Sequence, residues 1–132
     1  MTAESSLSIL TAIDGSNVVV QDWPLDSSVK LRGVVIVVHG LGEHAGRYEH
    51  VARHLNAWGF AVRGYDQCGH GESSGARGSL PSDTRLLDDL ADMVDSTRTR
   101  YGKDTPVILI GHSMGGLVVG RFVSLQMRAV EG

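Results

Sequence analysis

A serine flanked by glycines, placed directly behind an apolar run, is the feature that most constrains the fold of this chain. Residues 107–110 are Val-Ile-Leu-Ile, and Gly111-His112-Ser113-Met114-Gly115-Gly116 follows at once. The apolar run predicts a buried strand over 106–110, and residues 114–127 predict a helix that is apolar on most of its circumference and should be buried. Gly-x-Ser-x-Gly between a strand and a helix predicts a sharp turn that lifts the serine hydroxyl clear of the sheet.

The remaining segments predict strands that alternate with helices. Segments 6–13 and 18–23 are rich in β-branched residues and flank a turn sequence, which predicts an antiparallel hairpin. Further strands are expected at 34–38 and 60–65, and further helices at about 46–58 and 83–100, the second with Asp83 or Ser82 as its N-cap. This order predicts an α/β fold, an antiparallel hairpin followed by three parallel strands with crossover helices, in one domain over residues 1–132.

Composition excludes several classes of protein. The 132 residues are 42% hydrophobic, enough to bury a core, and their net charge of -3 comes with no basic cluster, so nucleic acid is not an expected partner. Cys68 permits no intrachain disulfide, and the first residues lack the regions of a signal peptide, so we expect a cytoplasmic protein. The apolar run 34–38 is far below the roughly 18 residues of a membrane span, so no transmembrane segment is expected.

A second glycine-rich loop strengthens the interpretation of the serine as a nucleophile. His39-Gly40-Leu41-Gly42 follows the predicted strand 34–38, at the place where an amide that binds a developing oxyanion is expected. Ser113 is therefore the candidate nucleophile for attack on a carbonyl, and Gly111 and Gly115 leave room for the tight turn around it.

Together these motifs resemble the N-terminal half of an α/β-hydrolase of the monoacylglycerol lipase and lysophospholipase branch, also grouped with the serine aminopeptidase-like hydrolases. The matching motifs are His39-Gly40-Leu41-Gly42-Glu43-His44, Arg47-Tyr48, Asp66 with Gly69-His70-Gly71 and Ser73, Gly75 with Arg77-Gly78, and Gly111 to Gly116. The resemblance implies that Ser113 is the nucleophile and that the backbone amides of Leu41 and Met114 form the oxyanion hole. It implies supporting roles for His39, Gly40, Gly42, Gly111, His112 and Gly115.

The other polar residues of these motifs and helices are expected to have structural roles. Glu43, His44, Arg47 and Tyr48 are expected to brace the loop after residues 34–38, and the glycines of the loop 66–78 to serve its backbone conformation. His50 and His54 have the i, i+4 spacing of a zinc pair but lack the glutamate of HExxH and a third ligand, so a solvated helical face is favoured. The stripe of Asp88, Asp92 and Asp95 is likewise expected on an exposed face, and Cys68 in a packing role. No metal and no organic cofactor are expected.

The position of Ser113 in the chain limits these expectations. The resemblance implies an acid and then a base after the serine, yet the 19 residues that follow it contain no His, no Asp and one Glu. We therefore expect an apparently truncated domain that lacks the acid and base of the triad and has little or no activity alone. The outer edge of the strand 106–110 should be bare, which favours self-association or a complementing C-terminal half.

Two classes of function remain open. The first is a serine hydrolase of carboxylic esters, most plausibly acylglycerols or lysophospholipids, that works through an acyl-enzyme on Ser113, with peptidase, thioesterase or general esterase activity as alternatives within the class. The second is a non-catalytic remnant or interaction module.

Overall fold

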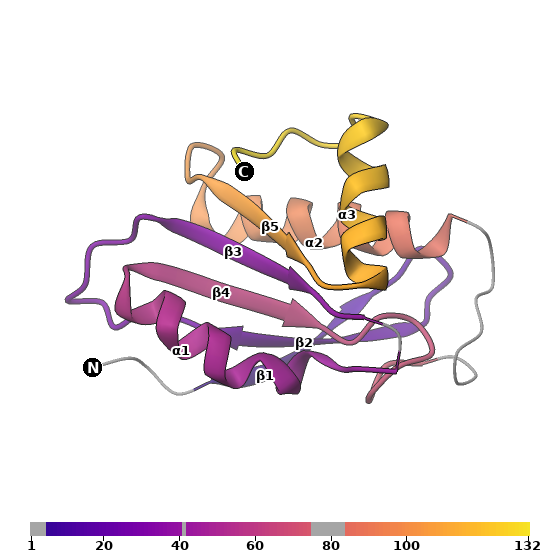
Figure 1. The fold of residues 1–132 in the computed structure, drawn as a ribbon, viewed down its shortest axis with the longest axis horizontal. Coiled ribbons are helices and arrows are strands. Elements are labelled where there is room, and N and C mark those ends of the chain that lie inside the picture. The colour runs from indigo at the N-terminus through magenta and orange to yellow at the C-terminus, as the bar shows by residue number, and fades with distance from the viewer. Residues whose placement is uncertain (1–4, 41, 75–83) are drawn as a thin grey trace.

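The computed structural model describes residues 5–40, 42–74 and 84–132, which form a five-stranded mixed sheet with helices on both faces (Figure 1). The strands are β1 (Ser6–Thr11), β2 (Asn17–Trp23), β3 (Gly33–Val38), β4 (Phe60–Tyr65) and β5 (Val107–Gly111). Their order in the sheet is β1-β2-β4-β3-β5. The hairpin β1–β2 joins β4 antiparallel, whereas β4, β3 and β5 run parallel, so the predicted α/β arrangement is confirmed.

The central strand β3 is buried along its whole length. It pairs with β4 on one side and with β5 on the other, and every residue from Gly33 to Val38 is buried. Its unbroken run of β-branched residues suits this position, because both of its faces are covered by helices.

One face of the sheet packs against α1. The segment predicted as one helix over 46–58 begins with a 3₁₀ turn, η1 (Ala45–Tyr48), and continues as α1 (Glu49–Ala57). Ala52 of α1 contacts Trp23, Val35 and Val62 in a small apolar cluster on this face.

The opposite face packs against α2 (Arg85–Tyr101) and α3 (Met114–Ser124). The larger core lies here and includes Ile36 of β3, Leu90 and Met93 of α2, and Val118 and Phe122 of α3. The N-cap of α2 is Thr84, so the prediction of Ser82 or Asp83 is wrong, and these two residues lie outside the described part of the chain. No described helix is long and apolar enough to cross a membrane.

Buried charge joins α2 to the sheet. Arg63 of β4 donates from Nε to Oδ1 of Asp22 in β2 at 2.6 Å. Its Nη1 donates to the hydroxyls of Ser96 and Thr97 at 3.0 and 2.9 Å. Arg100 approaches the other oxygen of Asp22 at 3.0 Å. Removing one member would leave buried charge unpaired, so this network specifies where α2 crosses the sheet.

Two expectations about the C-terminal part are wrong. The helix after Ser113 was expected to be buried and to reach residue 127, but α3 ends at Ser124, and Leu117 on it is 76% exposed. Only three of its residues are buried, Gly115, Val118 and Phe122. The helix is apolar nearly all round, but the described chain supplies packing partners for one side of it.

The outer edge of β5 is not bare. Beyond α3 the chain turns back, and Glu131 donates its amide to the carbonyl of Val107 at 2.9 Å, while the amide of Leu109 donates to Gly132 at 2.9 Å. The Glu131 carboxylate also accepts the Val107 amide at 2.8 Å and lies 3.1 Å from Arg98 of α2. Residues 131–132 thus satisfy part of the edge that the sequence had suggested was open, and Figure 1 shows the C-terminus beside β5.

Candidate active site

Ser113 lies at the tip of the turn from β5 into α3. It is exposed, and its φ of 57° and ψ of -117° are outside the conformations that a serine ordinarily adopts. Such strain is typical of functional positions that the surrounding structure holds in place. Met114 is the first residue of α3, and amides in the first turn of a helix have no acceptor within the helix, so its N–H can serve a ligand.

Glycines allow this turn to pack tightly against the sheet. A Cβ atom added at Gly115 would lie 2.0 Å from the carbonyl oxygen of Val38, and one at Gly111 would lie 2.4 Å from the carbonyl oxygen of Gly115. A side chain at Gly115 would push α3 away from β3, and one at Gly111 would push it away from the end of β5. The close approach also allows the amide of His112 to donate to Val38 at 3.1 Å, which ties the turn to the end of β3.

The loop that follows β3 is anchored from beneath by His39. This side chain is fully buried, and its Nε2 accepts the backbone N–H of Gln67 at 2.9 Å, so its Nδ1 carries the hydrogen that is donated to the Gly40 carbonyl at 2.8 Å. The side-chain amide of Gln67, through Nε2, donates in turn to the backbone carbonyl of His39 at 2.7 Å. Burial lowers the pKa of His39, which favours this neutral imidazole.

Glu43 links the same loop to the serine turn. Its Oε1 accepts the Gly40 N–H at 2.7 Å and the Tyr48 hydroxyl at 2.8 Å, and it lies 3.1 Å from Nδ1 of His112. Arg47 pairs with the other carboxylate oxygen at 3.5 Å. These hydrogen bonds, the one from Gly40 first, lower the pKa of Glu43 to about 2, so the side chain is an anion at neutral pH.

Asp66 organises the next loop, at the end of β4. One of its oxygens accepts the amide of Ala45 at 2.8 Å and the other accepts the amide of Glu72 at 2.9 Å. Its carbonyl accepts the hydroxyl of Ser73, which in turn accepts the Val19 amide at 2.8 Å. Asp66 therefore joins the loop to η1 and to β2, and the structural role expected for residues 66–74 fits these contacts; residues 75–78 lie outside the described part.

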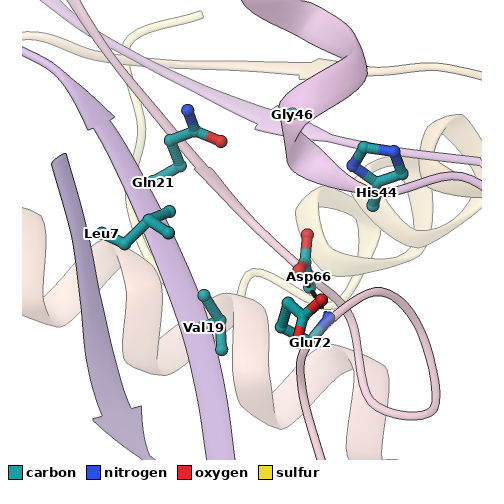
Figure 2. Close-up of a pocket in the computed structure, with 7 residues that line it drawn as sticks. All are labelled: Leu7, Val19, Gln21, His44, Gly46, Asp66 and Glu72. Carbon is teal, nitrogen blue, oxygen red and sulfur yellow. Dashed lines mark hydrogen bonds between the residues drawn. The ribbon is translucent and has the colours of Figure 1, made fainter. Parts of the chain in front are cut away.

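A separate small cavity of about 260 Å³ opens beside Asp66. Figure 2 shows the residues that line it, Leu7, Val19, Gln21, His44, Gly46, Asp66 and Glu72. They come from the β1–β2 hairpin, the start of η1 and the loop after β4, and Ser113 is not among them. Because no residue of the serine turn lines it, the cavity is distinct from that turn, and both carboxylate oxygens of Asp66 already accept backbone amides.

The remaining candidates lie apart from the serine. His50 and His54 are exposed on α1 with their Nε2 atoms 3.3 Å apart, and the described residues contain no group of three or more His, Cys, Asp or Glu that could hold a metal. On α2, Asp95 is exposed and pairs with Arg128 at 2.8 Å, whereas Asp88 and Asp92 are partly buried, so the exposed face expected for this stripe is confirmed for Asp95 alone. Burial raises the pKa of the Cys68 thiol, which disfavours the reactive thiolate.

The structure brings together most residues singled out in the sequence. His39, Gly40, Gly111, His112, Ser113, Met114 and Gly115 gather where β3 and β5 end, whereas Leu41 lies outside the described residues. Gly42 adopts a φ of 74°, a left-handed conformation that glycine favours. Sequence reasoning missed Gln67 and the contact between Glu43 and His112. A signal for Gln67 was its place two residues after the strand 60–65.

Known proteins share this arrangement. The family model described as serine aminopeptidase, S33 matches residues 29–132. A monoacylglycerol lipase of Mycolicibacterium smegmatis is 40% identical over 113 residues, which cover 81% of this chain and 37% of the lipase. Human monoglyceride lipase is 37% identical over 109 residues, which cover 83% of this chain and 35% of that protein.

A solved structure agrees with these matches. A soluble variant of monoglyceride lipase from Saccharomyces cerevisiae, in complex with a substrate analog, has a TM-score of 0.86 at 26% identity, over 100% of this chain and 43% of that one. The chain therefore spans less than half the length of these three relatives. Sequence and structure agree that the chain belongs to the serine aminopeptidase S33 family of hydrolases and forms the N-terminal half of the α/β-hydrolase fold.

Proposed function

We propose that this chain carries the nucleophile of a serine hydrolase that cleaves carboxylic esters, with acylglycerols or lysophospholipids as the substrate class. The observation that carries the proposal is the exposed, strained Ser113 at the start of α3, with Gly40 and its loop beside it. The relatives named as lipases support the substrate class.

The proposed chemistry begins with attack of the Ser113 Oγ on the ester carbonyl. The serine proton passes to a base, and an Oγ–carbon bond forms. The ester C–O bond then breaks, and the base returns the proton to the departing alcohol. Water hydrolyses the resulting acyl-enzyme and releases the fatty acid and the serine hydroxyl. The amides of Leu41 and Met114 would hold the oxyanion in each step. Losing one such donor typically costs about 10²- to 10³-fold in rate.

The described residues offer no base for this step. His39 and His70 are buried and bonded to backbone carbonyls, and the ring of His112 is turned to Glu43. Within the described part of the chain, no histidine ring is hydrogen-bonded to the Ser113 hydroxyl. We therefore propose that a further stretch of polypeptide supplies the acid and the base, and that the 132 residues alone show little turnover.

The exposed apolar side of α3 supports this second part of the proposal. Leu117, Val123 and Leu125 are 76%, 49% and 46% exposed, and Ile110 at the end of β5 is 37% exposed. Exposed large apolar side chains on and beside one helix favour a contact surface there. The same surface favours the alternative, an interaction module that binds a partner through α3 without chemistry of its own.

A chimera separates the two functions. Residues 1–132 are fused to the part of the Mycolicibacterium lipase that follows its matched segment, and hydrolysis of a monoacylglycerol is measured beside Ser113→Ala and the 132-residue chain. We expect activity in the chimera, a fall in kcat of about 10⁶-fold in Ser113→Ala, and almost none in the short chain. A chimera that melts cooperatively and is equally active with and without Ser113 would refute the nucleophile assignment.

The same chimera tests the substrate class. A monoacylglycerol, a lysophospholipid, an acyl thioester and an aminoacyl amide are compared by kcat/KM. The proposal requires the two lipid esters to be the best substrates, and preference for the amide would instead support the peptidase alternative.

A further inference from the structure

Glu43 lies where the two loops of the candidate site touch. A Cβ atom added at Gly40 would lie 2.7 Å from Oε1 of Glu43, 3.1 Å from the carbonyl of His112 and 3.3 Å from Cβ of Ser113. The loop after β3 and the serine turn are thus in contact across this point. Whatever fixes one loop against the other also fixes the nucleophile against the amides of the first loop.

A single oxygen of Glu43 bonds to both loops. It accepts the Gly40 N–H from one and faces Nδ1 of His112 in the other, although Glu43 and His112 are 69 residues apart in the chain. An ionised carboxylate only accepts hydrogen bonds, so Nδ1 of His112 carries the hydrogen in this contact. The Tyr48 hydroxyl donates to the same oxygen and holds the carboxylate in place from η1.

We propose that Glu43 is a positioning residue, which sets the distance between Ser113 and the oxyanion-binding loop by holding Gly40 and His112 on one carboxylate oxygen. This inference rests on the proposed function of Ser113 and adds a residue to it. Glu43 does not contact the substrate in this proposal and acts only through the two loops.

The charge and the length of the side chain both matter. Hydrogen bonds to a charged acceptor are roughly twice as strong as those between neutral groups, so a glutamine at this position would hold the loops more weakly. Aspartate keeps the charge but is one methylene shorter, and it could not reach both loops without backbone movement. Neither substitution removes an apolar contact of the core.

The test uses the chimera described above, in which the lipase part supplies the acid and the base, and two independent measurements. The first is the rate at which a fluorophosphonate probe labels Ser113, and mass spectrometry confirms the labelled site. In this reaction the Oγ–P bond forms, the P–F bond breaks, and the serine proton leaves with fluoride. The second is the hydrogen-exchange rate of the Gly40 amide by NMR. Glu43→Gln and Glu43→Asp are compared with wild type.

Glu49→Gln is the matched control. Glu49 is also a carboxylate in a hydrogen bond, here from Nε1 of Trp23 at 2.7 Å, but it has no contact with either loop. We expect Glu43→Gln to slow labelling at least tenfold and to speed exchange of the Gly40 amide at least tenfold, with Glu49→Gln within twofold of wild type in both. Glu43→Asp should behave as Glu43→Gln does.

Three results would overturn the proposal. They are unchanged labelling in Glu43→Gln, unchanged exchange of the Gly40 amide in that variant, and equal effects of Glu43→Gln and Glu49→Gln. If the chimera with Glu43 intact is not labelled at all, the proposed function of Ser113 fails on its own, and the link between the loops is then tested by the amide signals of Gly40 and Ser113. Movement of both signals in Glu43→Gln supports the link between the loops, and movement of one alone refutes it.

Discussion

The tight approach of α3 to β3 can be tested by adding one methyl group. In Gly115→Ala the new Cβ atom would lie 2.0 Å from the carbonyl oxygen of Val38 and 2.6 Å from that of His39. Ordinary contacts between such atoms are longer by more than 1 Å, so the start of α3 must move by about that distance. The neighbour is backbone at the end of the buried strand β3, which cannot turn aside as a side chain could.

Three contributions make up the expected change in the free energy of unfolding. Overpacking of this kind costs about 1–3 kcal/mol, and the bond from the His112 amide to Val38, 3.1 Å long, would lose about 1 kcal/mol. Replacing glycine by alanine inside a helix returns up to about 1 kcal/mol. With the full return, we expect Gly115→Ala to lower the free energy of unfolding by about 1–3 kcal/mol.

The control is Gly120→Ala in the same helix. Nothing lies within 4 Å of a Cβ atom at Gly120, so this change should raise the free energy of unfolding by about 0.5–1 kcal/mol through helix propensity. Urea denaturation followed by circular dichroism measures both variants. If Gly115→Ala matches Gly120→Ala within about 0.5 kcal/mol, the close contact between α3 and β3 is refuted.

Three further outcomes are expected. In urea denaturation, Ser113→Gly should raise the free energy of unfolding by about 1 kcal/mol, because glycine accepts the φ of 57°, whereas Ser113→Ala should not. Equal stabilities of the two variants would show that the turn is unstrained. The pKa of Glu43 is lowered to about 2, so the folded state favours its ionised form and stability should fall as the pH drops from about 4.5 towards 2. In a series of melts, Glu43→Gln should flatten that fall while Glu49→Gln should not. Glu131→Ala should speed hydrogen exchange of the Val107 amide about tenfold, because that amide donates to the Glu131 carboxylate. The same change should promote self-association, measured by sedimentation, because it exposes the edge of β5. Unchanged exchange would contradict this account of the β5 edge.

Local pattern predicted most of the elements. The strand Phe60–Tyr65 was predicted with its observed bounds, because a short, mostly apolar segment between Gly59 and a glycine-rich loop is too short for a helix. The helix boundaries were less accurate, and η1 was missed. A 3₁₀ turn and the first turn of an α-helix differ little in sequence, so the contacts of Ala45 with the sheet decide which one forms.

The candidate site divides in the same way. The serine, its flanking glycines and the loop after β3 were identified from residue types and spacing, because a strand-turn-helix with a protruding hydroxyl needs those residues in that order. The environment of His39 and the partner of His112 could not be identified in this way. Gln67 and Glu43 are 28 and 69 residues from the side chains they bond, and no local pattern relates positions so far apart.

The sequence by itself determined the α/β alternation, the hairpin at the start and the exposed serine between β5 and α3, because all of these follow from the period of apolar residues and from the placement of glycines. Only the tertiary structure decided that Glu43 joins two loops, that Arg63 is buried against Asp22, and that residues 131–132 lie along β5. These contacts depend on strand order. Placing β3 between β4 and β5 brings together ends of strands that are distant in the chain, and their polar groups must then find partners there.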